Sequence, residues 1–259
     1  WADSEYGFAG FTYQLAMTAE MLVVSLIFLL AYGNKYISSK VLIIGLVILF
    51  VICTFLTGKR MNSVLAIFMV MLYLIFNGKV NKKLVFIILI ILSIAGVSYF
   101  LANADALGDS MIFRRFTYSI ELSNSGGDLD SGRNFLWNKA IELYNSNPIF
   151  GIGPGKFVTV SRTGTDVHNM YLQCLCEYGL LGMLLFCIPL VYCLLSTFSL
   201  LRKSKDSSTY ILYLSFALQL NYMLEGITEN TNTNLCGFIM YAVGVAIFVD
   251  YKYRYRYEY

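Results

Sequence analysis

Long apolar blocks dominate this sequence and limit what it can fold into. They run for roughly 17 to 25 residues, the length that an α-helix needs to cross a hydrocarbon core about 30 Å thick. Only 14% of the residues are charged, which is too few for the surface of a soluble chain of this size. We therefore expect an all-α integral membrane protein with about seven transmembrane helices. The predicted spans are 12–32, 41–57, 63–77, 84–101, 169–200, 209–226 and 234–250.

The basic residues indicate how these spans are oriented. Four basic patches follow the first, third, fifth and seventh spans, so all four fall on one side of the membrane. The positive-inside tendency makes that side the cytoplasm. We expect the start of the chain outside and the C-terminus inside, in a multi-pass protein of the bacterial cytoplasmic membrane. The patches are Lys35 and Lys40; Lys79, Lys82 and Lys83; Arg202, Lys203 and Lys205; and Lys252, Arg254 and Arg256.

The C-terminal sequence YKYRYRYEY alternates aromatic residues with cations. It has the composition of a nucleic-acid patch, but directly after a spanning helix an interfacial anchor is the favoured interpretation. Tyr then sits at the level of the lipid headgroups, while Arg and Lys meet anionic lipid. We therefore expect the bilayer as a partner and no nucleic acid.

One long connection, residues 102–167, lies outside in this topology. It separates four helices in 1–101 from three helices and a short cytoplasmic tail in 168–259. The positive-inside tendency disfavours cations in such a place, although long loops obey it weakly. An anionic ligand would account for them. The cations are Arg114, Arg115, Arg133, Lys139, Lys156 and Arg162.

An amphipathic helix is predicted within this loop, over about 132–146, and it ends before Pro148. One face suits the membrane surface, with Arg133 directed at a lipid phosphate. The same face also suits packing against the protein, with Arg133 paired to a carboxylate such as Asp130. The residues of this face are Arg133, Trp137, Ala140 or Ile141, and Tyr144.

The glycine cluster in residues 151–157 is not a phosphate-binding loop. Phe150 stands where such a loop needs its first glycine, and Phe157 follows the lysine where Ser or Thr is required. We expect a tight connector with several turns.

A second pair of cations, Lys59 and Arg60, lies in the turn between the second and third spans. The same topology places this turn outside, and short loops usually obey the charge bias. Arg60 suits either contact with a lipid phosphate at the interface or the binding of an anionic ligand.

The only histidine, His168, stands where the loop runs into the fifth span. Thr165 and Asp166 are the expected caps of that helix. A helix N-terminus disfavours the imidazolium, and a neutral imidazole can accept a proton as a general base. The alternative is an interfacial histidine that is hydrogen-bonded into the cap, for example to Asp166.

The fifth span carries Asn169, Gln173 and Glu177 on one helical face. Glu177 must face protein or water, so it marks either an interior polar site or a structural hydrogen-bond hub. The segment is too long for one straight crossing. We therefore expect a short initial helix, a break near Gly179 and then the span.

In order and spacing, these features resemble the O-antigen ligase/polymerase family (Wzy/WaaL type) over about residues 41–200. The motifs are R-x-x-x-W-x-x-A from Arg133, N-P-x-x-G-x-G-x-G-x-F from Asn147 and H-N-x-Y-L-x-x-x-x-E-x-G-L-x-G from His168. The turn at Arg60 looks like the Ser-Arg turn of that family. It departs from it in having Gly-Lys before the arginine and Met61 after it, and Arg60 is favoured over Lys59 as the equivalent cation.

The resemblance implies a membrane glycosyltransferase of the GT-C type. Such enzymes move glycan from an undecaprenyl-diphosphate carrier to an acceptor glycan at the outer face of the membrane, without a metal or other cofactor. Arg60 and Arg133 would bind the donor diphosphate, and His168 would accept the proton of the attacking hydroxyl. A chain-length regulator is a further partner to expect. Supporting roles would fall to Lys59, Arg114, Arg115, Trp137, Asn169 and Glu177.

Three alternatives remain open at this point. A repeat-unit polymerase for capsule or exopolysaccharide is favoured over a ligase, because the abundance of Tyr, Ile, Lys and Asn suggests an AT-rich, Gram-positive genome. A lipid-glycan flippase or transporter would also bury polar residues, but no internal repeat or pair of broken helices is visible. A non-catalytic scaffold is the third alternative. The chain begins at Trp1 and not at Met, so we expect a fragment whose missing upstream spans complete the lipid-binding cavity.

Overall fold

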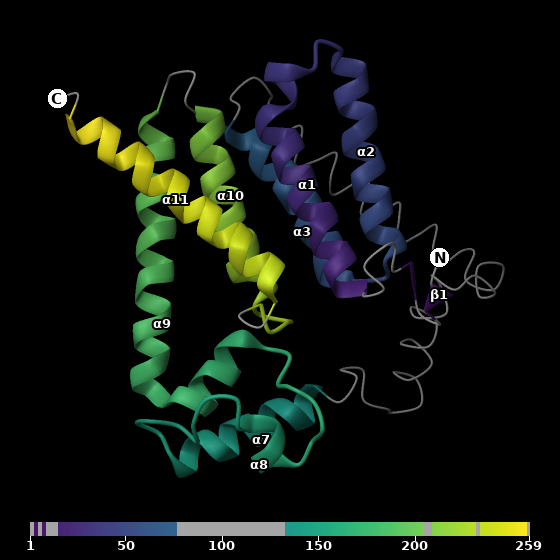
Figure 1. The fold of residues 1–259 in the computed structure, drawn as a ribbon. Helices are drawn as coiled ribbons and strands as arrows, with labels where there is room; N and C mark the ends of the chain where they lie inside the picture. Colours follow the sequence, from purple (N-terminus) through teal and green to yellow (C-terminus); the bar gives the residue numbers. More distant parts are fainter. Residues whose placement is uncertain are drawn as a thin grey trace. The chain divides into compact units, whose positions relative to one another are not determined.

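The computed structural model describes residues 3–4, 7–8, 15–76, 133–204, 209–231 and 234–257 of the chain. Two short strands, β1 (Asp3–Ser4) and β2 (Gly7–Phe8), form an antiparallel pair. Every other regular element in these residues is a helix, as Figure 1 shows, so the expected all-α class holds for this part of the chain. The chain divides into two compact units, unit 1 (1–129) and unit 2 (130–259).

The described residues of unit 1 contain three helices that pack against one another: α1 (Leu15–Tyr36), α2 (Lys40–Leu56) and α3 (Arg60–Phe76). Ser39 begins α2, where its hydroxyl accepts a hydrogen bond from the Leu42 N–H at 3.3 Å. This satisfies one of the N–H groups that a helix start leaves unpaired. One face of α1 is buried, while α2 leaves many apolar side chains exposed, as a helix in contact with lipid does.

Unit 2 contains α7 (Arg133–Ser146), α8 (Phe157–Ser161), α9 (Met170–Lys203), α10 (Thr209–Glu225) and α11 (Leu235–Tyr257). The helix α7 occupies nearly the range predicted for the amphipathic helix. The helix α10 packs against both α9 and α11, and it is the most extensively buried of the three. Polar contacts help to hold it, because Ser215 Oγ donates to Gly244 O at 2.6 Å and Gln219 Nε2 to Thr197 Oγ1 at 3.0 Å.

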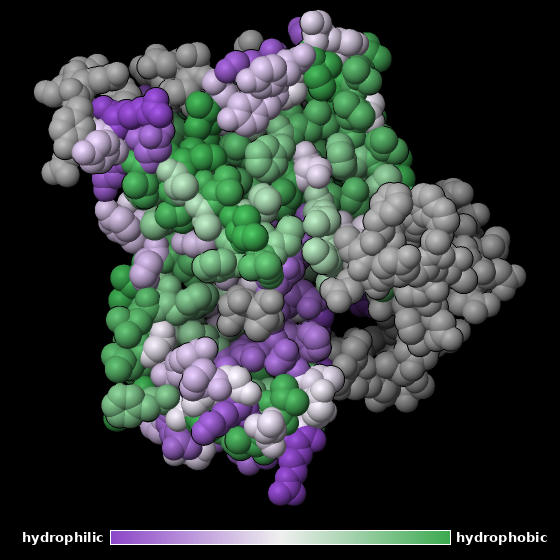
Figure 2. All heavy atoms as spheres, in the orientation of Figure 1, coloured by the Kyte–Doolittle hydropathy of each residue, from purple (hydrophilic) through white to green (hydrophobic). Residues whose placement is uncertain are grey.

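Three of the described helices are long and apolar enough to cross a membrane: α1, α9 and the Leu235–Arg254 part of α11. The helices α2 and α3 are also apolar, with 17 residues each. Figure 2 shows apolar side chains gathered over the long helices of unit 2 and hydrophilic ones around α7 and α8. The chain is therefore a membrane protein. The count of seven spans stays a prediction, since the predicted span 84–101 lies outside the described residues.

A small apolar core joins α7 and α8 to the beginning of α9. In it, partly buried side chains such as Trp137 pack against a buried set. The second half of the predicted loop thus forms a folded layer on one end of α9. The buried set is Leu136, Ala140, Phe157, Val167 and Cys176.

Candidate functional site

Asn169 begins α9. Its backbone is extended, and its Oδ1 accepts hydrogen bonds from the N–H groups of Tyr171 and Leu172, both at 3.0 Å. The prediction that Thr165 or Asp166 caps this helix was therefore wrong. A cap must directly precede the first helical residue, and the chain stays irregular up to Asn169. Asp166 instead accepts a hydrogen bond from Gln173 Nε2 at 3.3 Å.

His168 lies directly before this cap and has a left-handed backbone, with φ 53°. Such a conformation costs roughly 1–2 kcal/mol for a residue with a side chain, and functional sites are where it is typically retained. The turn after α10 holds this part of the chain in place, because the Met170 N–H donates to Gly226 O at 2.8 Å and to Glu229 O at 3.2 Å. The His168 side chain is 42% exposed, so a ligand can reach it.

The carboxylate that faces His168 belongs to Glu229, in the turn after α10. Glu229 Oε2 lies 3.5 Å from His168 Nδ1, and Glu229 Oε1 lies 3.7 Å from Arg133 Nη2. We call Arg133, His168 and Glu229 the His168 cluster. It brings together two residues that the sequence singled out, from α7 and from the start of α9.

Glu229 is the member of this cluster that the sequence analysis missed. The predicted topology places the connection between the last two spans outside, on the same side as the long loop, but it does not tell which residue of that connection meets His168. Arg133 does pair with a carboxylate, as one interpretation expected, but that partner is Glu229. Asp130, the partner suggested by proximity in sequence, lies outside the described residues.

Glu177 is a hydrogen-bond hub, the second of its two predicted roles. Its Oε2 accepts from the Gly155 N–H at 2.9 Å, and its Oε1 accepts from the Phe157 N–H at 3.1 Å and from Gln173 Nε2 at 3.3 Å. The side chain is buried. Glu177 therefore fixes the glycine-rich connector and the start of α8 onto α9. Its contribution to the His168 cluster is structural, because it holds the elements around the start of α9 in place.

The predicted break near Gly179 is confirmed. Gly179 has φ 67° and ψ −170°, and it interrupts α9. The backbone groups freed by the break pair with the connector, because the Ile152 N–H donates to Cys176 O at 3.0 Å and the Leu180 N–H donates to Pro148 O at 2.8 Å. These bonds tie the initial part of α9 to the segment that joins α7 and α8. The break at Gly179 separates this initial part from the long apolar part of the helix that follows.

The inner face of α7 differs in detail from the predicted one. Ala140 is fully buried, while Ile141 is 43% exposed, so Ala140 is the inward residue. Leu136 is also buried and was not predicted. Trp137 packs on the apolar core, and its Nε1 is buried without a hydrogen-bond partner among the described residues. A buried unpaired donor is uncommon and marks Trp137 as a residue to test.

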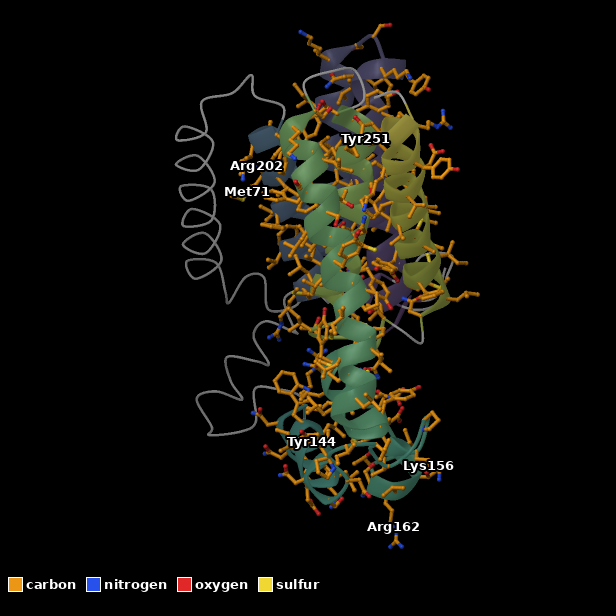
Figure 3. The ribbon with its side chains drawn as sticks, turned by 90° about the vertical axis from the view of Figure 1, so that its left-hand side faces the viewer. Met71, Tyr144, Lys156, Arg162, Arg202 and Tyr251 are labelled. Carbon is orange, nitrogen blue, oxygen red and sulfur yellow. The ribbon has the colours of Figure 1, made fainter. Side chains whose placement is uncertain are left out.

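The other three loop cations that the structure describes lie apart from the cluster. Lys139 Nζ pairs with Glu142 Oε2 at 2.8 Å on the outer face of α7. Figure 3 shows Lys156 and Arg162 pointing outward at the end of the unit that contains α7 and α8, and both are exposed. Arg114 and Arg115 lie outside the described residues.

Lys59 and Arg60 form the start of α3, in unit 1. Gly58 has φ 70°, which reverses the chain after α2, and the Ser63 N–H donates to Lys59 O at 3.1 Å in the first turn of the helix. Arg60 is exposed. The first N–H groups of a helix carry partial positive charge, so Arg60 and this helix start both favour an anion.

The described residues contain no group of three His, Cys, Asp or Glu side chains placed to hold a metal ion. The His168 cluster offers a proton acceptor, a carboxylate and a guanidinium. Such a set suits the binding of an anionic ligand and the transfer of a proton.

These features define a helical membrane protein with an Arg–Glu–His cluster at the start of a broken membrane helix. The O-antigen ligase family (Wzy_C) matches residues 44–187, more than half of the chain, and the chain belongs to this family. The resemblance stated from the motifs is thus confirmed. The exopolysaccharide production protein ExoQ of Rhizobium meliloti (strain 1021) is 26% identical over 99 residues, which cover 32% of this chain and 23% of that relative. The chain therefore matches only about a quarter of the relative's length.

Proposed function

We propose that this chain is the catalytic part of a membrane glycosyltransferase that polymerises undecaprenyl-diphosphate-linked glycan repeat units at the outer face of the bacterial cytoplasmic membrane. The observation that carries the proposal is the His168 cluster, in which a reachable imidazole and a guanidinium share one carboxylate. Its occurrence in a chain of the O-antigen ligase family supports the same reaction class.

In the proposed reaction, His168 accepts the proton of an acceptor hydroxyl. The hydroxyl oxygen attacks the anomeric carbon of the donor glycan, and a glycosidic bond forms. The bond between that carbon and the diphosphate oxygen breaks, and its electron pair leaves with the diphosphate. The step needs no oxidant or reductant, and the proton on His168 is returned to water afterwards.

Negative charge grows on the diphosphate as it leaves, so fixed cations near it lower the barrier. Arg133 suits this role because its planar fork of donors matches phosphate oxygens and stays charged. Arg60 is the second proposed diphosphate ligand, supported by its place at the start of α3. Lys59 lies next to it and adds positive charge.

A polymerase is favoured over a ligase that joins glycan to a lipid A core. The relative from Rhizobium meliloti bears a name from exopolysaccharide production, and the composition of the chain favours a cell without an outer membrane. A ligase is the alternative within the same reaction class. In it, His168 would again be the base, and Arg60 and Arg133 would again bind the diphosphate.

The test is His168→Ala in the full-length parent, expressed in a strain that lacks its own polymerase. A general base contributes roughly 10²–10⁴-fold to a rate, so we expect loss of long glycan and accumulation of single repeat units on the lipid carrier. The matched control is Arg162→Ala, because Arg162 has a similar left-handed backbone (φ 58°) in the same loop. It should make glycan of normal length.

Two outcomes would contradict the proposal. Glycan of wild-type length from His168→Ala, at equal protein level, removes the base from the mechanism. Repeat units trapped on the cytoplasmic face would instead indicate a flippase.

A further inference from the structure

Glu229 connects the two proposed catalytic groups of unit 2. One oxygen of its carboxylate faces Arg133 and the other faces His168, at 3.7 Å and 3.5 Å. The side chain is 20% exposed, which is less than either partner. The Coulomb attraction between such groups is therefore screened less by solvent than it is on an open surface.

The backbone of Glu229 takes part in the turn in which it lies. The Glu229 N–H donates to Glu225 O at 3.0 Å, and Glu229 O accepts from the Met170 N–H at 3.2 Å. Both bonds are made by backbone atoms of Glu229. The two carboxylate oxygens are placed toward Arg133 and His168 by this backbone arrangement.

We propose that Glu229 is a positioning residue that fixes the tautomer and orientation of the His168 imidazole; this inference rests on the function proposed above. A neutral imidazole carries one proton, on Nδ1 or on Nε2. A carboxylate only accepts hydrogen bonds, so it favours the proton on the nitrogen that it faces, Nδ1. The lone pair of Nε2 then points away from Glu229 and is free to take the proton of the acceptor hydroxyl.

The same carboxylate stabilises the imidazolium that forms when the hydroxyl proton has been taken up, because opposite charges then lie side by side. It also limits how Arg133 moves. A guanidinium has five N–H donors, and Glu229 occupies one side of the fork, which leaves the others for phosphate oxygens. The Glu229 carboxylate therefore fixes His168 and Arg133 relative to each other.

The first experiment uses the single histidine of this chain. Protein labelled with ¹⁵N in histidine alone gives two imidazole nitrogen signals for His168 in solid-state NMR, and His168→Asn assigns them by their loss. At a pH where the ring is neutral, we expect the proton on Nδ1 in the wild type. Glu229→Gln keeps an acceptor and should keep this tautomer, whereas Glu229→Met removes it and should move the proton to Nε2.

The second experiment measures turnover in the full-length parent. We expect Glu229→Gln to lower kcat by roughly 10- to 100-fold, the range typical of groups that orient a functional histidine, while KM for the lipid-linked substrate changes little. Glu229→Met should lower it further. Glu142→Gln is the matched control, because it removes an exposed carboxylate that pairs with Lys139, and it should leave kcat unchanged.

The outcomes separate this inference from the proposed function. The NMR measurement needs no substrate, so it reads the tautomer even if the wild type makes no polymer. A proton on Nε2 in the wild type, or an unchanged tautomer in Glu229→Met, overturns the positioning role. If the wild type makes polymer and the Glu229 variants are fully active, the positioning role is also overturned, while the proposed function stands.

Discussion

At the scale of single residues, Glu177 shows how one buried carboxylate can organise a loop. It receives two backbone N–H groups, from Gly155 and Phe157. A buried carboxylate without such partners would be strongly unfavourable, and buried N–H groups without an acceptor would be too. Each side therefore satisfies the other, and the connector adopts one geometry.

We predict that Glu177→Gln destabilises the folded protein by about 1–3 kcal/mol, the cost of a buried unpaired polar group. The amide keeps one acceptor oxygen, and its NH₂ group must face one of the two N–H donors. Thermal unfolding in detergent measures the change, with the exposed Glu142→Gln as control. An unfolding temperature equal to that of the wild type would show that this carboxylate does not hold the connector.

Residue type and topology were enough to predict His168 and Arg133 as site candidates. Glu229 could not be found in the same way, because its contacts join the turn after α10 to α7 and to the start of α9, far apart in the chain. Spacing along a helix reports only neighbours within a few residues. Pairing across such distances is a property of the fold.

At the scale of elements, the break in α9 is the feature on which the layer of α7 and α8 depends. Two glycines allow the connector and the helix to touch. A Cβ on Gly151 would lie 2.4 Å from the Glu177 carbonyl carbon, and one on Gly179 would lie 2.3 Å from Ile149 O. No side chain fits there, because these contacts are with backbone atoms that cannot move aside.

Gly151 and Gly155 make a matched pair that isolates this steric effect. Both have left-handed backbones, with φ 69° and 65°, but a Cβ on Gly155 meets nothing within 4 Å. We predict that Gly155→Ala costs only about 1–2 kcal/mol for its backbone conformation, whereas Gly151→Ala adds a clash and gives little folded protein. Yield and unfolding temperature in detergent report the difference. Equal behaviour of the two variants would mean that the close approach at Gly151 does not exist.

The positions of the helices followed closely from hydropathy. The predicted spans 41–57 and 209–226 correspond to α2 (Lys40–Leu56) and α10 (Thr209–Glu225), and the break at Gly179 was predicted from length. The predicted fifth span begins at residue 169, one residue before α9, but its cap was placed too early, because Thr165 and Asp166 are good capping residues by type. Asn169 is equally good, and the docking of Met170 on Gly226 O decides in its favour.

At the scale of the whole molecule, the orientation of unit 2 in the membrane decides whether the His168 cluster can meet a substrate on the outer side. The positive-inside argument puts the loop outside and the C-terminus inside, which requires α9, α10 and α11 all to cross. The helix α10 has 17 residues, at the lower end of the length that spans a bilayer. It is therefore the helix on which this topology depends.

Labelling at two uncharged, exposed positions tests the orientation without disturbing its charge signals. Val160→Cys lies in α8 and Tyr253→Cys lies near the end of α11. We predict that a membrane-impermeant maleimide labels Val160→Cys in intact cells and Tyr253→Cys only after permeabilisation. Peptide mass spectrometry reports each position separately from the six native cysteines. If both positions react in intact cells, an even number of helices crosses between them, so at least one of α9, α10 and α11 does not span, and the C-terminus lies on the same side as the His168 cluster.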